Sequence, residues 1–228
     1  MPSPITTLFV DVGGVLLTNG WGHTARLRAA KHFDLDGGML DRRHYATFTL
    51  YEEGKLSLDD YLDRTVFYED RPFSREDFRE FMFSQSEAHP QTIELVRNLK
   101  ARHGLKVVAI SNEGFELTAY RIEKFALKTF IDLFVFSCFV RCRKPDQEIY
   151  YMAMDIAQVS PEAVVYIEDQ PMFVEVAKGL GIHAFTHLSD KFTRQFLAEL
   201  GLPPEGDSSC QRGAECQVAS CPDKTAKS

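Results

Sequence analysis

Four segments of the chain carry polar side chains whose chemistry is complementary. The residues are Asp11 in FVDVGGVL, Ser111 and Asn112 in VVAISNEG, Lys144 in RKPDQEIY, and Glu168 with Asp169 in VVYIEDQP. A carboxylate can act as a nucleophile, hydroxyl and ammonium groups can bind an anion, and paired acids can hold a metal ion. Each residue alone also has an ordinary structural explanation, such as a turn or a helix cap. Their occurrence together favours one common site.

A phosphate ester is the substrate class that would need this set of groups. A phosphate dianion repels nucleophiles, so a cation must offset its charge, and magnesium prefers oxygen ligands. Asp11 and Asp169 are candidate carboxylate ligands, and the backbone carbonyl of Gly13 can supply a further oxygen. Lys144 would add a fixed positive charge, while Ser111 and the backbone N–H groups that follow it would bind the phosphoryl oxygens. Asp11 would then form an aspartyl-phosphate that water hydrolyses.

Short apolar runs alternate with helical patterns through much of the chain. The apolar runs cover residues 8–11, 105–110, 134–136, 163–167 and 182–185, and the helical patterns cover 116–127, 146–157, 171–180 and 190–200. This alternation predicts an α/β fold with a mostly parallel sheet and helices on both faces. In such a sheet ligands bind beyond the carboxyl ends of the strands, which is where the polar residues fall.

The stretch from about Trp21 to Ser86 breaks the alternation, because it shows helical patterns and no convincing strand. Ser57 and Ser74 each precede acids, as expected at a helix N-terminus, and Pro90 begins a further helix. The simplest interpretation is a small all-helical cap inserted after the first strand; the alternative is a separate helical domain unconnected with the site. The predicted units are the cap at 18–87, the α/β core at 1–17 and 88–202, and a disordered tail at 203–228.

Composition narrows the class of protein further. The chain has 228 residues, of which 44% are hydrophobic and 26% charged, as in an ordinary globular protein. A formal net charge of −7 argues against a nucleic-acid surface. No apolar run approaches the roughly 20 residues of a membrane span, and no secretory signal is evident. The five cysteines show no CxxC pair and are expected to be reduced thiols, so we expect a cytoplasmic protein.

Taken together, the four segments resemble the motifs of the haloacid dehalogenase-like superfamily, in order and spacing, over residues 6–200. The resemblance implies a Rossmann-like fold with a helical C1-type cap, of which YEEGKLSLDDYL is typical, and a Mg²⁺-dependent hydrolase of small phosphate esters. The implied roles are Asp11, Ser111 and Lys144 in catalysis; Ser111, Asn112 and Lys144 in phosphate binding; and Asp11, the Gly13 carbonyl, Glu168 and Asp169 in metal binding. Asp169 is favoured over Glu168 as the direct ligand.

One position departs from most phosphatases of this superfamily, in which an aspartate two residues after the nucleophile protonates the leaving group. Here that position is Gly13, and loss of a general acid typically removes about 10²–10⁴-fold in rate. Relatives with DxGGV- or DLGNV-type motifs, which include phosphatases of glucose-1-phosphate-like substrates, also have glycine there. A weakly active or non-catalytic protein that binds a phosphorylated ligand or partner is the alternative. A dehalogenase is disfavoured, because that branch lacks the acid pair kept here at 168 and 169.

The cap would select the substrate, which we expect to be a small phosphorylated molecule such as a sugar phosphate. Trp21 and His23 follow the first motif and could reach the mouth of the site. His23 could partly replace the missing acid, because imidazole titrates near neutrality; a packing or surface histidine is the ordinary alternative. We expect no nucleic-acid partner and no membrane association.

Overall fold

The computed structural model describes residues 4–204. Most of the predicted disordered tail, from residue 205 onward, lies outside the described residues. Pro203 and Pro204 belong to the packed structure, two residues beyond the predicted boundary. The carbonyl of Pro203 accepts a hydrogen bond from Nε2 of His103 at 3.0 Å, and Pro204 is buried.

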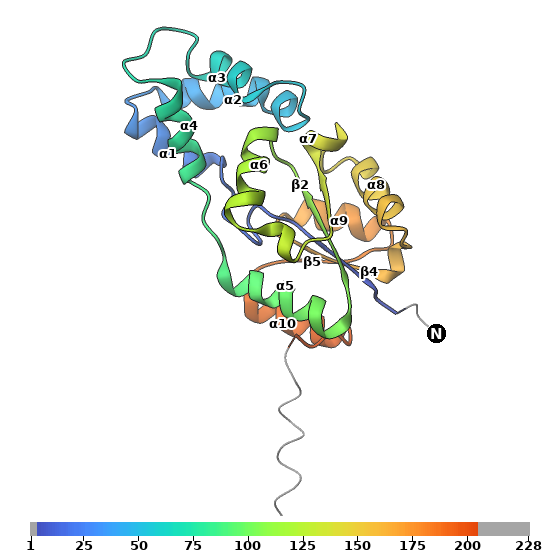
Figure 1. Ribbon diagram of the computed structural model, residues 1–228. Helices are drawn as coiled ribbons and strands as arrows, with labels where there is room; N and C mark the ends of the chain where they lie inside the picture. The colour runs from blue at the N-terminus through green and yellow to red at the C-terminus, as the bar shows by residue number, and fades with distance from the viewer. Residues whose placement is uncertain (1–3, 205–228) are drawn as a thin grey trace, which may run out of the picture.

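A parallel sheet forms the centre of the molecule (Figure 1). Its strands are β1 (Thr7–Val10), β2 (Lys106–Ser111), β3 (Leu133–Phe136), β4 (Val164–Glu168) and β5 (His183–Thr186). They lie in the order β3-β2-β1-β4-β5, and every pairing is parallel. The predicted α/β fold with a parallel sheet is therefore confirmed, with strand ends within a few residues of those expected.

Helices cover both faces of the sheet, because successive strand residues point to opposite sides. Leu8 and Val10 of β1 belong to one hydrophobic cluster, and Phe9 between them belongs to the other. The first cluster is closed by α5 (Pro90–His103), α6 (Phe115–Lys124) and α10 (Asp190–Glu199), and the second by α8 (Gln147–Ala157) and α9 (Pro171–Gly179). A short helix, α7 (Ser137–Val140), and the 3-10 turns Leu127–Thr129 and Pro161–Ala163 complete these connections.

A layer of helices lies between β1 and α5 in the chain and packs apart from the sheet (Figure 1). This helical layer consists of α1 (His23–His32), α2 (Gly37–Glu52), α3 (Leu58–Thr65) and α4 (Arg75–Ser84). Ser57 and Ser74 cap α3 and α4 through complete capping boxes, as the sequence predicts. The layer has its own aromatic-rich hydrophobic cluster, and Leu117 of α6 packs into this cluster from the core.

The two chain segments that connect the helical layer to the sheet run side by side. Leu17 forms an antiparallel bridge with Ala88, and the N–H of Thr18 donates to the carbonyl of Glu87 at 2.9 Å. The hydroxyl of Thr18 also donates to the carbonyl of Gln85 at 2.8 Å. The chain thus enters and leaves the helical layer at one narrow place, shortly after the Asp11 segment. Within residues 4–204 no helix combines the length and the apolar character that a membrane span requires.

Candidate active site

Three carboxylates meet at the carboxyl ends of two adjacent strands. Asp11 directly follows β1, Glu168 ends β4, and Asp169 comes next in the chain. Because β1 and β4 pair in parallel with Val10 opposite Ile167, their ends lie at the same edge of the sheet. One oxygen of each carboxylate lies within 4.8 Å of the other two. The structure therefore brings together the acids that the sequence singled out on separate segments.

Lys144 joins this cluster from the loop that precedes α8. Its side chain is 1% exposed, and its Nζ lies 3.1 Å from Oδ1 of Asp11 and 2.6 Å from Oε2 of Glu168. The ammonium group also donates to the carbonyl of Ile110 and the hydroxyl of Tyr166, each at 3.2 Å. Lys144 is therefore not a solvent-exposed loop residue, because its ammonium group is buried and contacts several polar groups.

The side chain of Asn112 holds the backbone of Lys144 in place. Its amide N–H donates to the carbonyl of Lys144 at 2.8 Å, and its amide oxygen accepts from the N–H of Lys144 at 2.9 Å. This pair of hydrogen bonds positions the lysine, and Asn112 itself also lines the cavity described below. Ser111 is buried beside it at the end of β2 and lines the cavity described below.

The charges of the cluster do not balance within the protein. Burial, reinforced by Glu168, raises the pKa of Asp11 to about 8, although Lys144 opposes the shift. Burial and Glu168 likewise raise the pKa of Asp169 to about 6. Burial alone would lower the pKa of Lys144, but the carboxylates of Asp11 and Glu168 raise it above its usual range. One ammonium group facing three carboxylates leaves room for a further cation, and an all-oxygen donor set suits Mg²⁺.

Gly13 and Gly14, which follow Asp11 closely, differ in how strongly the structure requires glycine at their positions. Gly14 has a φ of +82°, and a Cβ atom there would overlap the carboxylate of Asp169. This is a close approach that only glycine permits. Gly13 lacks such a φ; a Cβ on it would lie 3.1 Å from Oδ1 of Asn19.

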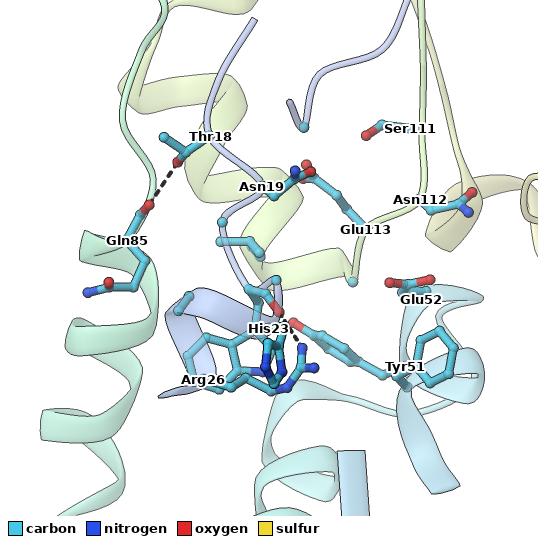
Figure 2. Close-up of a pocket in the computed structure, with 18 of the residues that line it drawn as sticks. Thr18, Asn19, His23, Arg26, Tyr51, Glu52, Gln85, Ser111, Asn112 and Glu113 are labelled. Carbon is cyan, nitrogen blue, oxygen red and sulfur yellow. Dashed lines mark hydrogen bonds between the residues drawn. The ribbon is translucent and has the colours of Figure 1, made fainter. Parts of the chain in front are cut away.

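A cavity of about 600 Å³ separates the carboxylate cluster from the helical layer. Asp11, Ser111, Lys144 and Asp169 lie on its sheet side. The helical layer and the segment leading into it contribute aromatic and polar side chains, among them Trp21, His23, Arg26, His44, Tyr45, Phe48, Tyr51 and Glu52. Figure 2 shows Glu52 across the cavity from Ser111 and Asn112. A ligand in this cavity would contact both parts of the chain.

Trp21 and His23 both line the cavity, but each is already engaged. Trp21 is buried, and its Nε1 donates to the hydroxyl of Tyr61 at 2.8 Å. Nδ1 of His23 lies 2.9 Å from Oδ2 of Asp41, with more than half of its side chain exposed. The ring of His23 is therefore tied to α2 rather than held over the carboxylate cluster.

Sequence reasoning missed two ion pairs that line the cavity. Arg121 of α6 pairs with Glu113, and its guanidinium group also donates to the carbonyl of Thr18. Glu52 of the helical layer pairs with Arg143, whose NH2 lies 2.8 Å from Oε2. The partners in the second pair are 91 residues apart in the chain. No short-range pattern connects them, so only the packing of the helical layer on the core could reveal the pair.

The fold and the site define a protein with a parallel sheet between helices and an aspartate directly after its first strand. The model of the haloacid dehalogenase-like hydrolase family matches residues 5–181. The chain therefore belongs to the haloacid dehalogenase-like hydrolases, which confirms the resemblance found in the motifs.

Similar proteins agree with this assignment. A phosphorylated carbohydrates phosphatase of Thermotoga maritima is 29% identical over 130 residues, which are 57% of this chain and 56% of that protein. The match thus spans only about half the length of this curated relative. A HAD family enzyme of Bacteroides thetaiotaomicron, crystallised with magnesium and inorganic phosphate, has a TM-score of 0.68 at 19% identity, covering 80% of this chain and 93% of that one. A predicted HAD-like hydrolase of Porphyromonas gingivalis gives 0.67 at 20% identity, with 85% and 98% covered.

Proposed function

We propose that the chain is a Mg²⁺-dependent phosphatase that hydrolyses small phosphate monoesters, with phosphorylated carbohydrates as the substrate class. The observation that carries this proposal is the buried set of Asp11, Glu168, Asp169 and Lys144 beneath a cavity of substrate size. A metal-free dehalogenase would not need a pair of acids at 168 and 169 to hold a cation. The phosphatase named for T. maritima supports the same substrate class.

In the proposed reaction Asp11 attacks phosphorus and forms an aspartyl-phosphate, which water then hydrolyses. Asp11, Asp169 and the carbonyl of Gly13 would hold Mg²⁺, with Glu168 supporting Asp169. The metal would offset negative charge on the phosphoryl group. Lys144 holds Asp11 by their 3.1 Å contact and presents a fixed positive charge to the phosphoryl oxygens, which Ser111 and the N–H groups after it would bind.

The lining of the cavity supports a carbohydrate as the alcohol part of the ester. Aromatic rings of Tyr45, Phe48 and Tyr51 lie among the charged side chains of Glu52 and Arg143. Sugar rings present apolar C–H faces and many hydroxyl groups, so a mixed aromatic and charged wall suits them. The helical layer would act as a cap that closes over the bound ester.

A screen of phosphate esters with Mg²⁺ tests this function. We expect wild type to hydrolyse sugar phosphates and aryl phosphates, and Asp11→Asn to lose this activity. Asp70→Asn is the matched control, because Asp70 is an exposed aspartate in the helical layer that does not line the cavity. Turnover that survives in Asp11→Asn would contradict the proposed nucleophile. Binding of phosphate esters without any turnover would favour the non-catalytic alternative.

A further inference from the structure

One carboxylate on the far wall of the cavity has no part in the chemistry described so far. Glu52 is the last residue of α2, and only 22% of its side chain is exposed. Its Oε2 accepts from both Nε and NH2 of Arg143, at 2.9 and 2.8 Å. Its other oxygen, Oε1, makes no hydrogen bond to any of the described residues. Glu52 thus presents one free oxygen on a cavity wall that faces the end of β2 (Figure 2).

The backbone around Glu52 is fastened to the core. The hydroxyl of Ser137 donates to the carbonyl of Glu52 at 2.6 Å and accepts from the N–H of Glu113 at 3.0 Å. Next to Glu52, the ring of Tyr51 packs so closely on Gly114 that a Cβ atom there would overlap it. The position of Glu52 relative to Ser111 is therefore set by short polar and apolar contacts rather than by a flexible loop.

In-line attack places the leaving oxygen on the side of phosphorus opposite to Asp11. Asp11 lies on the sheet side of the cavity, so the leaving oxygen faces the helical layer, which carries Glu52. Gly13 supplies no acid beside the nucleophile. We propose that Glu52 is the general acid of this protein, donating the proton to the leaving oxygen from the helical layer. This proposal rests on the phosphatase function proposed above.

The carboxyl group of Glu52 can supply the proton that the first half-reaction needs and take up the proton that the second one releases. As an oxygen of Asp11 bonds to phosphorus, the bond from phosphorus to the leaving oxygen breaks. Its electron pair stays on that oxygen, which takes the Glu52 proton and departs as the alcohol. Water then enters the same place, gives a proton to the Glu52 carboxylate and bonds to phosphorus. The bond between phosphorus and Asp11 breaks, Asp11 regains its carboxylate, and inorganic phosphate leaves with Glu52 protonated again.

The surroundings of Glu52 suit this role. Burial raises its pKa to about 7, against the opposing effects of Arg143 and Lys144 and with the help of Glu113. Tyr61 of α3 is a further titratable neighbour, and the negative charge of Glu52 contributes to the raised pKa of Tyr61. A carboxyl group with a pKa near neutrality can both give and take a proton at neutral pH. Rate with poor leaving groups should therefore fall as pH rises through about 7.

Other titratable groups on the cavity wall are less suited. Glu113 accepts from Arg121 through Oε1 and from Thr118 through Oε2, so both of its oxygens are engaged, and His23 is paired with Asp41. Burial lowers the pKa of His44 to about 3, so its ring carries no extra proton to give at neutral pH. A guanidinium group does not lose a proton in this range.

A leaving-group series of hydroxyl-free esters tests the role without invoking sugar contacts. We would measure kcat and KM for p-nitrophenyl, phenyl and ethyl phosphate with wild type and Glu52→Gln. The glutamine keeps an oxygen for Arg143 but has no acidic proton. We expect p-nitrophenyl phosphate turnover to stay within about 3-fold, and ethyl phosphate turnover to fall by about 10²-fold or more. The decline of kcat/KM above pH 7 with ethyl phosphate should disappear in the variant.

Two further variants separate the acid from a structural role. Glu53→Gln removes a neighbouring carboxylate that pairs with Lys55, and it should leave the leaving-group dependence unchanged. Glu52→Asp keeps an acidic proton and should recover part of the ethyl phosphate activity. An equal loss on all three esters, or an unchanged dependence in Glu52→Gln while Asp11 remains essential, would overturn the Glu52 assignment alone. Absence of Asp11-dependent hydrolysis in wild type would overturn the proposed function, and this inference with it.

Discussion

A Cβ atom on Gly13 would lie 3.1 Å from Oδ1 of Asn19 and 4.0 Å from NH1 of Arg121. The amide of Asn19 and the guanidinium of Arg121 thus border the place where related phosphatases carry their acidic side chain. The backbone of Gly13 does not require glycine, since its φ lies outside the left-handed region. What favours glycine here is the arrangement of its neighbours.

Gly13→Asp should therefore restore general acid catalysis only in part. Asn19 must shift by a few tenths of an ångström, and Arg121 would pair with the new carboxylate and lower its pKa. We expect the turnover of alkyl phosphates to rise by less than about 10-fold, well below the full contribution of a general acid. Kinetics with the leaving-group series measure this, and Gly13→Ala controls for space alone. A rise of 10²-fold or more would show that Arg121 does not restrain the new side chain.

Gly14→Ala should be far more damaging than Gly13→Ala, although both add one methyl group. At Gly14 the φ of +82° is strained for alanine, and the added carbon overlaps the carboxylate of Asp169. Strain of this kind costs about 1–3 kcal/mol, and displacement of Asp169 should lower activity as well. Urea unfolding and phosphatase assays on the two variants provide the comparison, and equal behaviour would contradict the geometry around Asp169.

Lys144→Met should reduce stability, phosphate affinity and turnover together. Removing the ammonium group leaves Asp11 and Glu168 buried without their cation, and breaking such a pair typically costs about 3–5 kcal/mol. Lys100→Met is the control, because Lys100 pairs with Asp132 at the surface, where an ion pair contributes about 1 kcal/mol or less. Chemical unfolding and phosphate titration distinguish the two. A Lys144 variant as stable and active as wild type would exclude the proposed role.

Mg²⁺ should raise the melting temperature, because a ligand that binds only the folded state stabilises it. Asp169→Asn should abolish this shift, since it removes a charged oxygen from the carboxylate cluster. EDTA should abolish activity in wild type, and added Mg²⁺ should restore it. Asp190→Asn is the control, because Asp190 bonds Thr92 away from the cluster. Undiminished turnover in EDTA would favour metal-free chemistry such as that of a dehalogenase.

His44 should make the helical layer sensitive to acid. Trp21 donates to the hydroxyl of Tyr61, which is then free to donate to Nδ1 of His44 at 2.8 Å. Burial, together with Arg26, lowers the pKa of His44 to about 3, whereas an unfolded histidine titrates at 6.5. Below pH 6.5 the unfolded chain binds more protons, so this contribution to stability is lost progressively from 6.5 toward 3.

Between pH 7.5 and 5.5 wild type should therefore lose about 1 kcal/mol more unfolding free energy than His44→Gln. The glutamine keeps an acceptor for Tyr61 but does not titrate. Urea unfolding at the two pH values measures the difference. The exposed His23 can be replaced in the same way as a control, and identical pH dependence in wild type and His44→Gln would contradict the buried neutral ring.

The sequence predicted the sheet and the carboxylate cluster well for a physical reason. Parallel strands direct their carboxyl ends to one edge, so Asp11 and Glu168 were expected at the same edge once the strands were recognised, and the pairing of β1 with β4 brings them together. The side chain of Asn112 holds the backbone of Lys144, a contact that the sequence did not reveal, and its role in phosphate binding stays a prediction. The Glu52–Arg143 pair was not foreseeable, because it depends on how the helical layer docks on the core. Local patterns carry no information about such docking.

The ties that fasten Tyr51 and Glu52 to the core also bear on how products escape. Ser137 and Arg143 both hold this turn down over the cavity. This turn can move away from the core only after these bonds break together. Opening is then a cooperative event with its own barrier, independent of the bond cleavage below. An enzyme limited by such an opening would form its first product in a rapid burst, and the opening would then set the rate of each later turnover.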